Sequence, residues 1–135
     1  MIKMKIAVDG IIKIGKNIVL VKRANEPFKN KYALPGGFIK FNEKISKAVS
    51  REIREEIGLI ARPIKLIGIY DNPNRDPRGR VVSIAFLCKV FGGKLKKGSD
   101  AKDVGLFNAK EVKKLKLAFD HKRIIRDFYA NKTVC

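Results

Sequence analysis

The chain is poor in the residues that build cross-linked or metal-bound scaffolds, with two cysteines, one histidine and no tryptophan in 135 residues. Cys88 and Cys135 lack the spacing of a metal site, and two cysteines do not make a disulfide framework. We therefore expect a reducing compartment and a cytoplasmic location. His121, the single histidine, has no partner by motif, so we expect a capping or structural role rather than catalysis.

Long hydrophobic runs are also missing from the sequence. The longest apolar stretch, Val81–Cys88, contains a serine and is too short to span a membrane. The charged start, residues 1–5, is not followed by an apolar core of signal-peptide length. No repeat, low-complexity tract or shift of composition divides the chain, and 45% of its residues are apolar. These observations argue against a membrane span and predict one domain over residues 1–135.

Acidic residues are scarce, because 13 aspartates and glutamates stand against 31 lysines and arginines, a formal net charge of +18. Such a charge favours a polyanionic partner, either nucleic acid or a small substrate attracted to the surface. No basic run alternates with stacking aromatic residues, as it does in single-strand-binding surfaces. We therefore expect a small polyanionic substrate in preference to nucleic acid. The net charge alone does not exclude a nucleic-acid partner.

One 23-residue segment, Gly37–Leu59, holds four of the 13 acidic residues: Glu43, Glu52, Glu55 and Glu56. Apolar residues recur every three to four positions over residues 45–57, which predicts a helix with one buried face. Gly58 follows at the position of a left-handed helix cap. The last three glutamates then share one helix face, where they repel one another unless a cation binds between them. Because Mg²⁺ prefers carboxylate oxygens, the segment predicts a divalent-metal site.

This segment resembles the Nudix box, GX5EX7REUXEEXGU with U aliphatic, and every specified position matches. Ala33–Gly37 is similar to the family's entry into its loop–helix–loop, and Val19–Arg23 to the strand before it. The resemblance covers nearly the whole chain. It implies an α+β fold, the family's α/β/α sandwich with a mixed β-sheet. It also implies hydrolysis of a nucleoside diphosphate linked to another group, with Mg²⁺ or Mn²⁺ as cofactor.

The resemblance implies four metal ligands: the carbonyl of Gly36 and the carboxylates of Glu52, Glu55 and Glu56. Glu52 and Glu56 would be the principal ligands, whereas Glu55 would bind a further metal or help to activate water. Arg51 would hold the glutamates by ion pairing, with Glu43 supporting that network.

The box does not fix the catalytic base, which varies between subfamilies. The family often carries a mobile catalytic acid in the loop that here includes Asp100 and Asp103. Most relatives with such a base use glutamate, and this loop has none. The base is therefore open between Glu55 and these two aspartates.

Five strands are predicted from apolar patterning and turn residues: Lys5–Ile14, Asn17–Lys22, Ile64–Tyr70, Val81–Phe91 and Val104–Phe107. Asn108, with Glu111 three residues later, predicts a capping box that opens a short helix. Asp120 is expected to cap a final helix with four inward residues: Ile124, Ile125, Phe128 and Tyr129.

Pro73, 14 residues after Leu59, matches a marker of the ADP-ribose pyrophosphatase subgroup. The neighbouring residues 74–79 and the later segment 118–121 are similar to that subgroup too. The resemblance implies that ADP-ribose is cleaved to AMP and ribose 5-phosphate by a homodimer in which the partner subunit often helps to form the site.

Residues that would hold such a substrate are the arginines and aromatics near these segments. Guanidinium groups suit phosphate and ribose oxygens, which gives four arginines: Arg23, Arg75, Arg78 and Arg80. Aromatic rings that could stack on adenine are those of Phe28, Tyr32 and Tyr70.

Three alternative functions use related chemistry. A MutT-like nucleoside triphosphate pyrophosphohydrolase shares the box, but Pro73 argues against it. An RNA 5′-pyrophosphohydrolase would fit the basic charge. An ADP-ribose-sensing binding protein without catalysis resembles the chain around residues 75–78 and 118–121, but such proteins normally have an eroded box, and here the box is intact.

Overall fold

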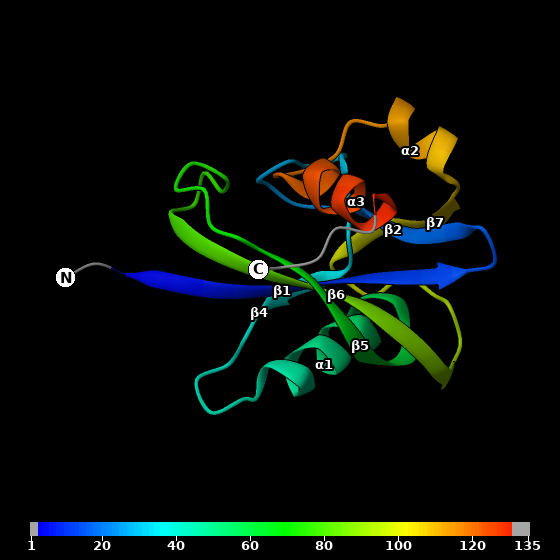
Figure 1. The fold of residues 1–135 in the computed structure, drawn as a ribbon, viewed down its shortest axis with the longest axis horizontal. Helices are drawn as coiled ribbons and strands as arrows, with labels where there is room; N and C mark the ends of the chain where they lie inside the picture. The colour runs from blue at the N-terminus through cyan, green and yellow to red at the C-terminus, as the bar shows by residue number, and fades with distance from the viewer. Residues whose placement is uncertain (1–2, 131–135) are drawn as a thin grey trace.

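A mixed seven-stranded β-sheet forms the centre of the protein in a computed structural model that describes residues 3–130 (Figure 1). Its strands are β1 (Met4–Ile14), β2 (Asn17–Arg23), β3 (Tyr32–Ala33), β4 (Gly36–Phe38), β5 (Leu59–Tyr70), β6 (Arg80–Gly93) and β7 (Ala101–Phe107). The helices are α1 (Ile45–Ile57), α2 (Ala109–Lys114) and α3 (His121–Tyr129). No helix in this part of the chain has the length and apolar character to cross a bilayer.

The long strand β1 organises the sheet, whose order is β3-β2-β1-β6-β5. Residues 4–12 of β1 pair in parallel with β6, and residues 13–14 pair antiparallel with β2. Two further strands lie outside this order: β4 pairs with β1, and β7 pairs with β2. The register of β4 with β1 places Gly37 opposite Val8 and Gly36 opposite Asp9, and residues 39–44 then connect β4 to α1.

Helices cover both faces of the sheet, α1 on one side and α3 on the other (Figure 1). The α1 side buries Val8 and Ile12 of β1 against Val49 and Ile53 of the helix. The other side has its own core, which includes Ile11, Leu20, Ile124 and Ile125. This layering confirms the expected α/β/α sandwich.

All five predicted strands are longer in the structure, β1 and β2 by one residue each and β6 by three, and two further strands were not predicted. β5 begins at Leu59 instead of Ile64, because Pro63 is accommodated on an edge strand beside a register shift. β7 begins at Ala101 instead of Val104. The missed strands β3 and β4 have two and three residues, too few to show an alternating pattern.

The two predicted helix starts have different outcomes. The capping box is confirmed, since Asn108 accepts from the Glu111 amide and Glu111 accepts from the Asn108 amide. Asp120 precedes α3 but makes no side-chain capping bond, because its carboxylate binds Arg75. The predicted burial of Tyr129 is wrong, since this residue is 44% exposed in the last turn of α3.

Cys88 is a buried free thiol that packs in the core on the α1 side of the sheet. Burial raises the pKa of this thiol to about 12, so it stays protonated and unreactive at neutral pH. Cys135 lies outside the described residues.

Candidate active site

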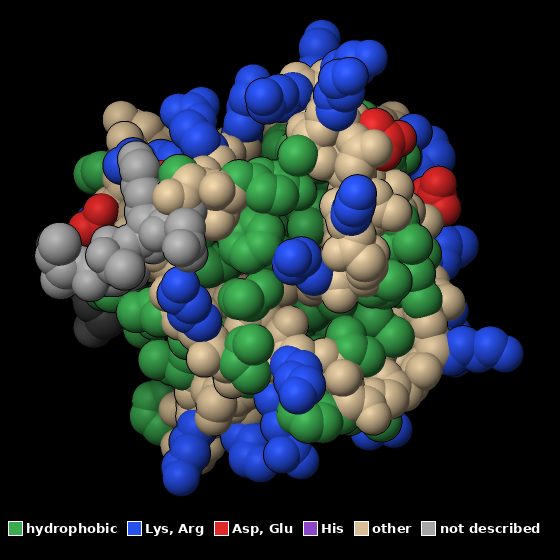
Figure 2. All heavy atoms as spheres, turned by 45° about the vertical axis from the view of Figure 1, so that its right-hand side comes forward, with side chains coloured by type: hydrophobic (Ala, Val, Ile, Leu, Met, Phe, Trp, Pro, Cys, Tyr) green, Lys and Arg blue, Asp and Glu red, His purple; other side chains and the backbone are tan. Residues whose placement is uncertain are grey.

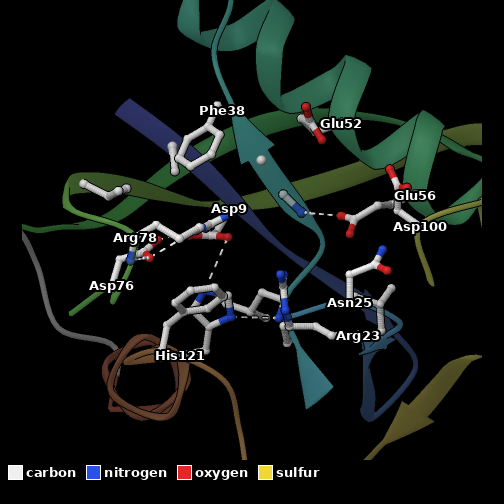
Figure 3. A pocket seen from close by; sticks show the side chains of 18 of the residues that line it. Asp9, Arg23, Asn25, Phe38, Glu52, Glu56, Asp76, Arg78, Asp100 and His121 are labelled. Carbon is white, nitrogen blue, oxygen red and sulfur yellow. Dashed lines mark hydrogen bonds and ion pairs between the residues drawn. The ribbon is translucent and has the colours of Figure 1, made fainter. Parts of the chain in front are cut away.

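Helix α1 presents its glutamates in two directions. Four apolar residues bury one stripe of the helix against the sheet: Ala48, Val49, Ile53 and Ile57. Glu52 and Glu56, one turn apart, extend toward β4 and line a pocket (Figure 3). Glu55 lies outside that lining, and its side chain is 58% exposed. The helix ends at Gly58, which has the predicted left-handed conformation with φ = 77°.

Arg51 fixes the acidic face of α1 through several bonds at once. Its Nε lies 2.6 Å from one oxygen of Glu43, and its Nη1 lies 2.7 Å from Glu52 and 3.2 Å from Glu55. Its Nη2 donates to the carbonyl of Phe38 at 3.1 Å, which ties the helix to β4. The hydrogen bonds from Arg51 lower the pKa of Glu43 to about 2. The structure thus contains the ion-pair network expected around Arg51.

Gly36 and Gly37 let β4 pass directly against the two pocket glutamates. The Gly36 amide donates to Oε2 of Glu56 at 2.6 Å (Figure 3). A Cβ on Gly37 would overlap the Glu52 carboxylate, with the Glu52 Cδ only 2.6 Å away. A Cβ on Gly36 would overlap the Val8 carbonyl. Both glycines are therefore required by close approach rather than by a turn.

The protein compensates the charged forms of the two pocket glutamates only in part. Burial raises the pKa of Glu56 to about 8, even though the hydrogen bond from Gly36 acts in the opposite direction. Burial also raises the pKa of Glu52, against the effect of Arg51. A cation bound between these carboxylates would stabilise their charged forms.

The oxygen atoms around the two pocket glutamates suit an ion such as Mg²⁺, which needs few protein ligands, better than a metal that needs a preformed set of side chains. Within residues 3–130, no three His, Cys, Asp or Glu side chains converge as a ready metal centre. Mg²⁺ commonly binds through one or two carboxylates and completes its shell with water and substrate phosphate. The pair Glu52 and Glu56, beside the backbone of Gly36, matches that requirement.

The pocket beside these glutamates has a volume of about 350 Å³. It lies between β1, the end of β2, β4 and α1, and the loops 71–79 and 118–121 close its other side. Arg23 and Arg78 enter it from the end of β2 and from the first of these loops (Figure 3). Burial and the charge of Arg78 lower the pKa of the Arg23 guanidinium, which indicates two cations close together. An anion between them would relieve that repulsion.

Aromatic rings hold these two arginines in place. Arg23 lies 5.1 Å and Arg78 lies 5.4 Å from the ring centre of Phe119, and Arg78 also lies 4.8 Å from that of Phe38. Asp76 binds the Arg78 guanidinium at 2.8 Å. The guanidinium groups are thus oriented before any ligand binds.

The other predicted arginines have separate roles. Arg75 lines the pocket but is buried, and Asp120 accepts two hydrogen bonds from its Nε and one from its Nη2. Arg80 donates to the carbonyl of Asp71 and does not line the pocket. Pro73, the subgroup marker, lies in an exposed turn outside the pocket.

The predicted stacking residues do not reach the pocket. Phe28 packs edge-on against Phe119 with ring centres 4.8 Å apart, and Tyr32 packs against Phe107 at 5.0 Å. The Tyr70 hydroxyl donates to Asp127 at 2.9 Å. These three rings belong to the packing around the site.

The two loop aspartates are separated by the start of β7. Asp100 lines the pocket (Figure 3), whereas Asp103 is exposed within β7 and accepts from the Val104 amide. The segment before Asp100 is bonded to the end of α1, since the Lys96 and Gly98 amides donate to carbonyls of Ile57 and Glu56.

A buried polar group that the sequence did not reveal lies at the bottom of the pocket. Asp9 of β1 accepts a hydrogen bond from Ser83 and lies 3.5 Å from Nε2 of His121. The Leu34 amide donates to the other ring nitrogen of His121, and burial lowers the pKa of this histidine. His121 is therefore a neutral, structural residue, as expected. No sequence motif surrounds Asp9. It reaches the pocket because β1 and β4 pair with Asp9 opposite Gly36.

Comparison with known proteins agrees with this geometry. The sequence model of the NUDIX domain matches residues 3–128. The chain is 51% identical over 123 residues to the ADP-ribose pyrophosphatase of Methanocaldococcus jannaschii, an alignment that covers 91% of this chain and 72% of that protein.

Solved structures give the same result. A MutT/nudix family protein from Enterococcus faecalis superposes with a TM-score of 0.86 at 31% identity, over 97% of this chain and 62% of the other. The NUDIX domain of Shewanella oneidensis NrtR, complexed with ADP ribose, also has a TM-score of 0.86, at 25% identity over 98% of this chain and 91% of the other. This chain therefore spans less than two thirds of the Enterococcus protein.

Proposed function

Because the chain belongs to the Nudix family, we propose that this hydrolase cleaves the pyrophosphate bond of ADP-ribose to AMP and ribose 5-phosphate. The observation that carries this proposal is the pairing of opposite charges in one pocket. Glu52 and Glu56 on one side attract a cation, and Arg23 and Arg78 on the other attract an anion. A metal-bound diphosphate satisfies both sides together. The 51% identity to an ADP-ribose pyrophosphatase supports ADP-ribose as the diphosphate.

The cofactor in this proposal is Mg²⁺, held by Glu52, Glu56 and the carbonyl of Gly36. When bound, such an ion neutralises the pyrophosphate and lowers the pKa of water. Arg51 orients Glu52, and the Gly36 amide orients Glu56. Arg23 and Arg78 bind the phosphate groups, and Asp100, which lines the pocket, accepts the proton of the attacking water.

Three predicted residues receive supporting roles. Glu55 neutralises Arg51 at the edge of the site. Arg75 positions Asp120 and the loop that carries Arg78. Asp103 stabilises the start of β7. Residues 1–135 act as one Nudix hydrolase domain in this proposal, and its place of action is the cytoplasm.

A panel of substrates with Mg²⁺ tests the proposed reaction. We expect AMP and ribose 5-phosphate to form fastest from ADP-ribose, with slower products from ADP-mannose and NADH, as separated by chromatography. The comparison substrates are 8-oxo-dGTP and triphosphorylated RNA. Release of pyrophosphate from these triphosphates, with ADP-ribose left intact, would assign the chain to the MutT-like or RNA-directed alternatives.

We also propose that the protein is a homodimer, which forms through a part of the sheet that no helix within residues 3–130 covers. Six apolar side chains form this apolar patch: Met4, Ile6, Leu66, Ile69, Val82 and Ile84. Register pairs Ile6 with Val82 and Ile69 with Ile84, so their side chains share a face. Met4 is 57% and Ile69 is 54% exposed. An exposed apolar sheet face without charges is typical of a subunit interface.

Charge inserted into the apolar patch should separate the subunits. Ile69→Glu places a carboxylate within the patch, on the edge strand β5, and we expect a dimer mass for the wild type and a monomer mass for this variant by light scattering. Leu106→Glu is the control, because Leu106 is 39% exposed on β7, outside the patch. A wild-type monomer at the working concentration, or a dimer that survives Ile69→Glu, would contradict this interface.

A further inference from the structure

An exposed aromatic ring lies between two cations at the open end of the β5–β6 hairpin, where β5 begins and β6 ends. The Arg62 guanidinium lies 4.9 Å from the ring centre of Phe91, and the Lys89 ammonium lies 5.6 Å from it. Phe91 is 55% exposed, and Ile60 beside it is 44% exposed. We call these four residues, Ile60, Arg62, Lys89 and Phe91, the cationic platform.

The platform faces away from α1 because of the strand alternation. Ala61 and Val90 are register partners, and both pack in the core on the α1 side. Arg62 and Lys89, the next pair along the ladder, therefore point to the opposite face. Phe91, two residues after Lys89, shares that face.

This end of the sheet contains cations without carboxylates. Residues 57–64 and 88–99, at this end of β5 and β6, hold five lysines and arginines and no aspartate or glutamate. Six of the 13 acidic residues instead line the pocket: Asp9, Glu26, Glu52, Glu56, Asp76 and Asp100. Beyond the platform the chain continues with three exposed lysines: Lys94, Lys96 and Lys97. Figure 2 shows the side toward which the hairpin end points, where blue side chains stand between apolar ones and few are red.

We propose that the cationic platform binds single-stranded RNA, as a function separate from hydrolysis in the pocket. Unpaired bases stack on aromatic rings and on guanidinium planes, which Phe91 and Arg62 supply. Lys89, beside the ring, neutralises a phosphate. A second copy of the chain does not fit here, since Arg62 and Lys89 would meet like charges. Arg62 and Phe91 are 29 positions apart, so the platform forms only in the fold.

Matched charge-reversal variants test whether RNA binds at this place or to the basic surface in general. The probe is a 20-nucleotide RNA with a 5′-hydroxyl and a 3′-fluorophore, followed by anisotropy without metal over a series of salt concentrations. Arg62→Glu/Lys89→Glu and Lys44→Glu/Lys47→Glu each lower the net charge from +18 to +14, since two cations become two anions. Lys44 and Lys47 lie at the start of α1, on the other side of the sheet. Circular dichroism verifies the fold of each variant.

We expect the platform double variant to weaken RNA binding at least tenfold more than its control. Phe91→Ala, which leaves the charge unchanged, should weaken binding at least fivefold, the effect of losing one stacked base. Equal losses in both double variants, or no effect of Phe91→Ala, would overturn the proposal. It would also be overturned if these variants lost binding to vesicles with 30% phosphatidylserine while still binding RNA.

Discussion

Replacing Glu56 by glutamine should leave a folded protein that turns over ADP-ribose about a thousandfold more slowly, because the metal loses several kcal/mol of charge stabilisation. Glutamine can still accept the Gly36 amide with its side-chain oxygen, so the contact between α1 and β4 is kept. The neutral amide is a poor ligand for Mg²⁺. Steady-state rates at saturating metal and substrate measure the effect.

The unfolding temperature should not fall with turnover when Glu56 is replaced by glutamine. Burial raises the pKa of Glu56 to about 8, so the metal-free fold favours the protonated carboxyl. The stability that this group contributes is present below about pH 4.5 and is lost as pH rises through 8. We therefore expect Glu56→Gln to unfold at the same or a higher temperature than the wild type at pH 8 without metal.

Glu111→Gln is the matched control for this variant. Glu111 lies in the capping box of α2, where glutamine can replace glutamate, and it does not line the pocket. Its turnover should equal that of the wild type. Near-normal activity of Glu56→Gln would remove Glu56 from the metal site.

A single methyl group on β4 should separate catalysis from folding. Alanine at position 37 would overlap the Glu52 carboxylate, which can turn aside at a cost of about 1 kcal/mol. A metal ligand displaced by about 1 Å should lower turnover about a hundredfold. Alanine at position 36 would instead overlap the Val8 carbonyl, and its Cβ would lie 2.9 Å from the Asp9 Cα. Because backbone cannot turn aside, Gly36→Ala should lower the unfolding temperature by about 10 °C.

Thermal unfolding and turnover, measured together on both variants, distinguish these effects. Gly92→Ala is the control, because its Cβ would meet only Ile60 at an ordinary 3.7 Å. It should leave both the unfolding temperature and turnover of the wild type unchanged. If Gly37→Ala kept full activity, the position of Glu52 would not matter for the reaction.

Local patterns carried the parts of the structure that the sequence predicted well. Helix α1 was predicted with its observed limits, because a 13-residue amphipathic stripe and a glycine cap are both encoded within one segment. The same holds for the capping box of α2. Spacing also placed Glu52, Glu55 and Glu56 on one face, but it could not show that Arg51 holds Glu55 at the rim while the other two enter the pocket.

The rest of the pocket depends on contacts between distant segments. Phe38, Phe119 and Asp9 line it, yet none was predicted as a site residue; the resemblance pointed to segment 118–121 but not to the ring of Phe119. The aromatic prediction chose Phe28 and Tyr32, which are near the right segment but pack behind the site. Among the predicted arginines, Arg75 forms an ion pair with Asp120, which is 45 residues away in sequence. No local sequence pattern predicts that ion pair.

The segment between β6 and β7 limits how this protein can be redesigned. Three of its amides, those of Lys94, Lys96 and Gly98, donate to the last carbonyls of α1 and its cap. A Cβ on Gly98 would overlap the Glu55 carbonyl, so no spare room separates this segment from the helix. A longer loop grafted here from another protein would loosen the end of the helix that carries Glu56. Loop exchange is better tolerated at residues 71–74, which are exposed.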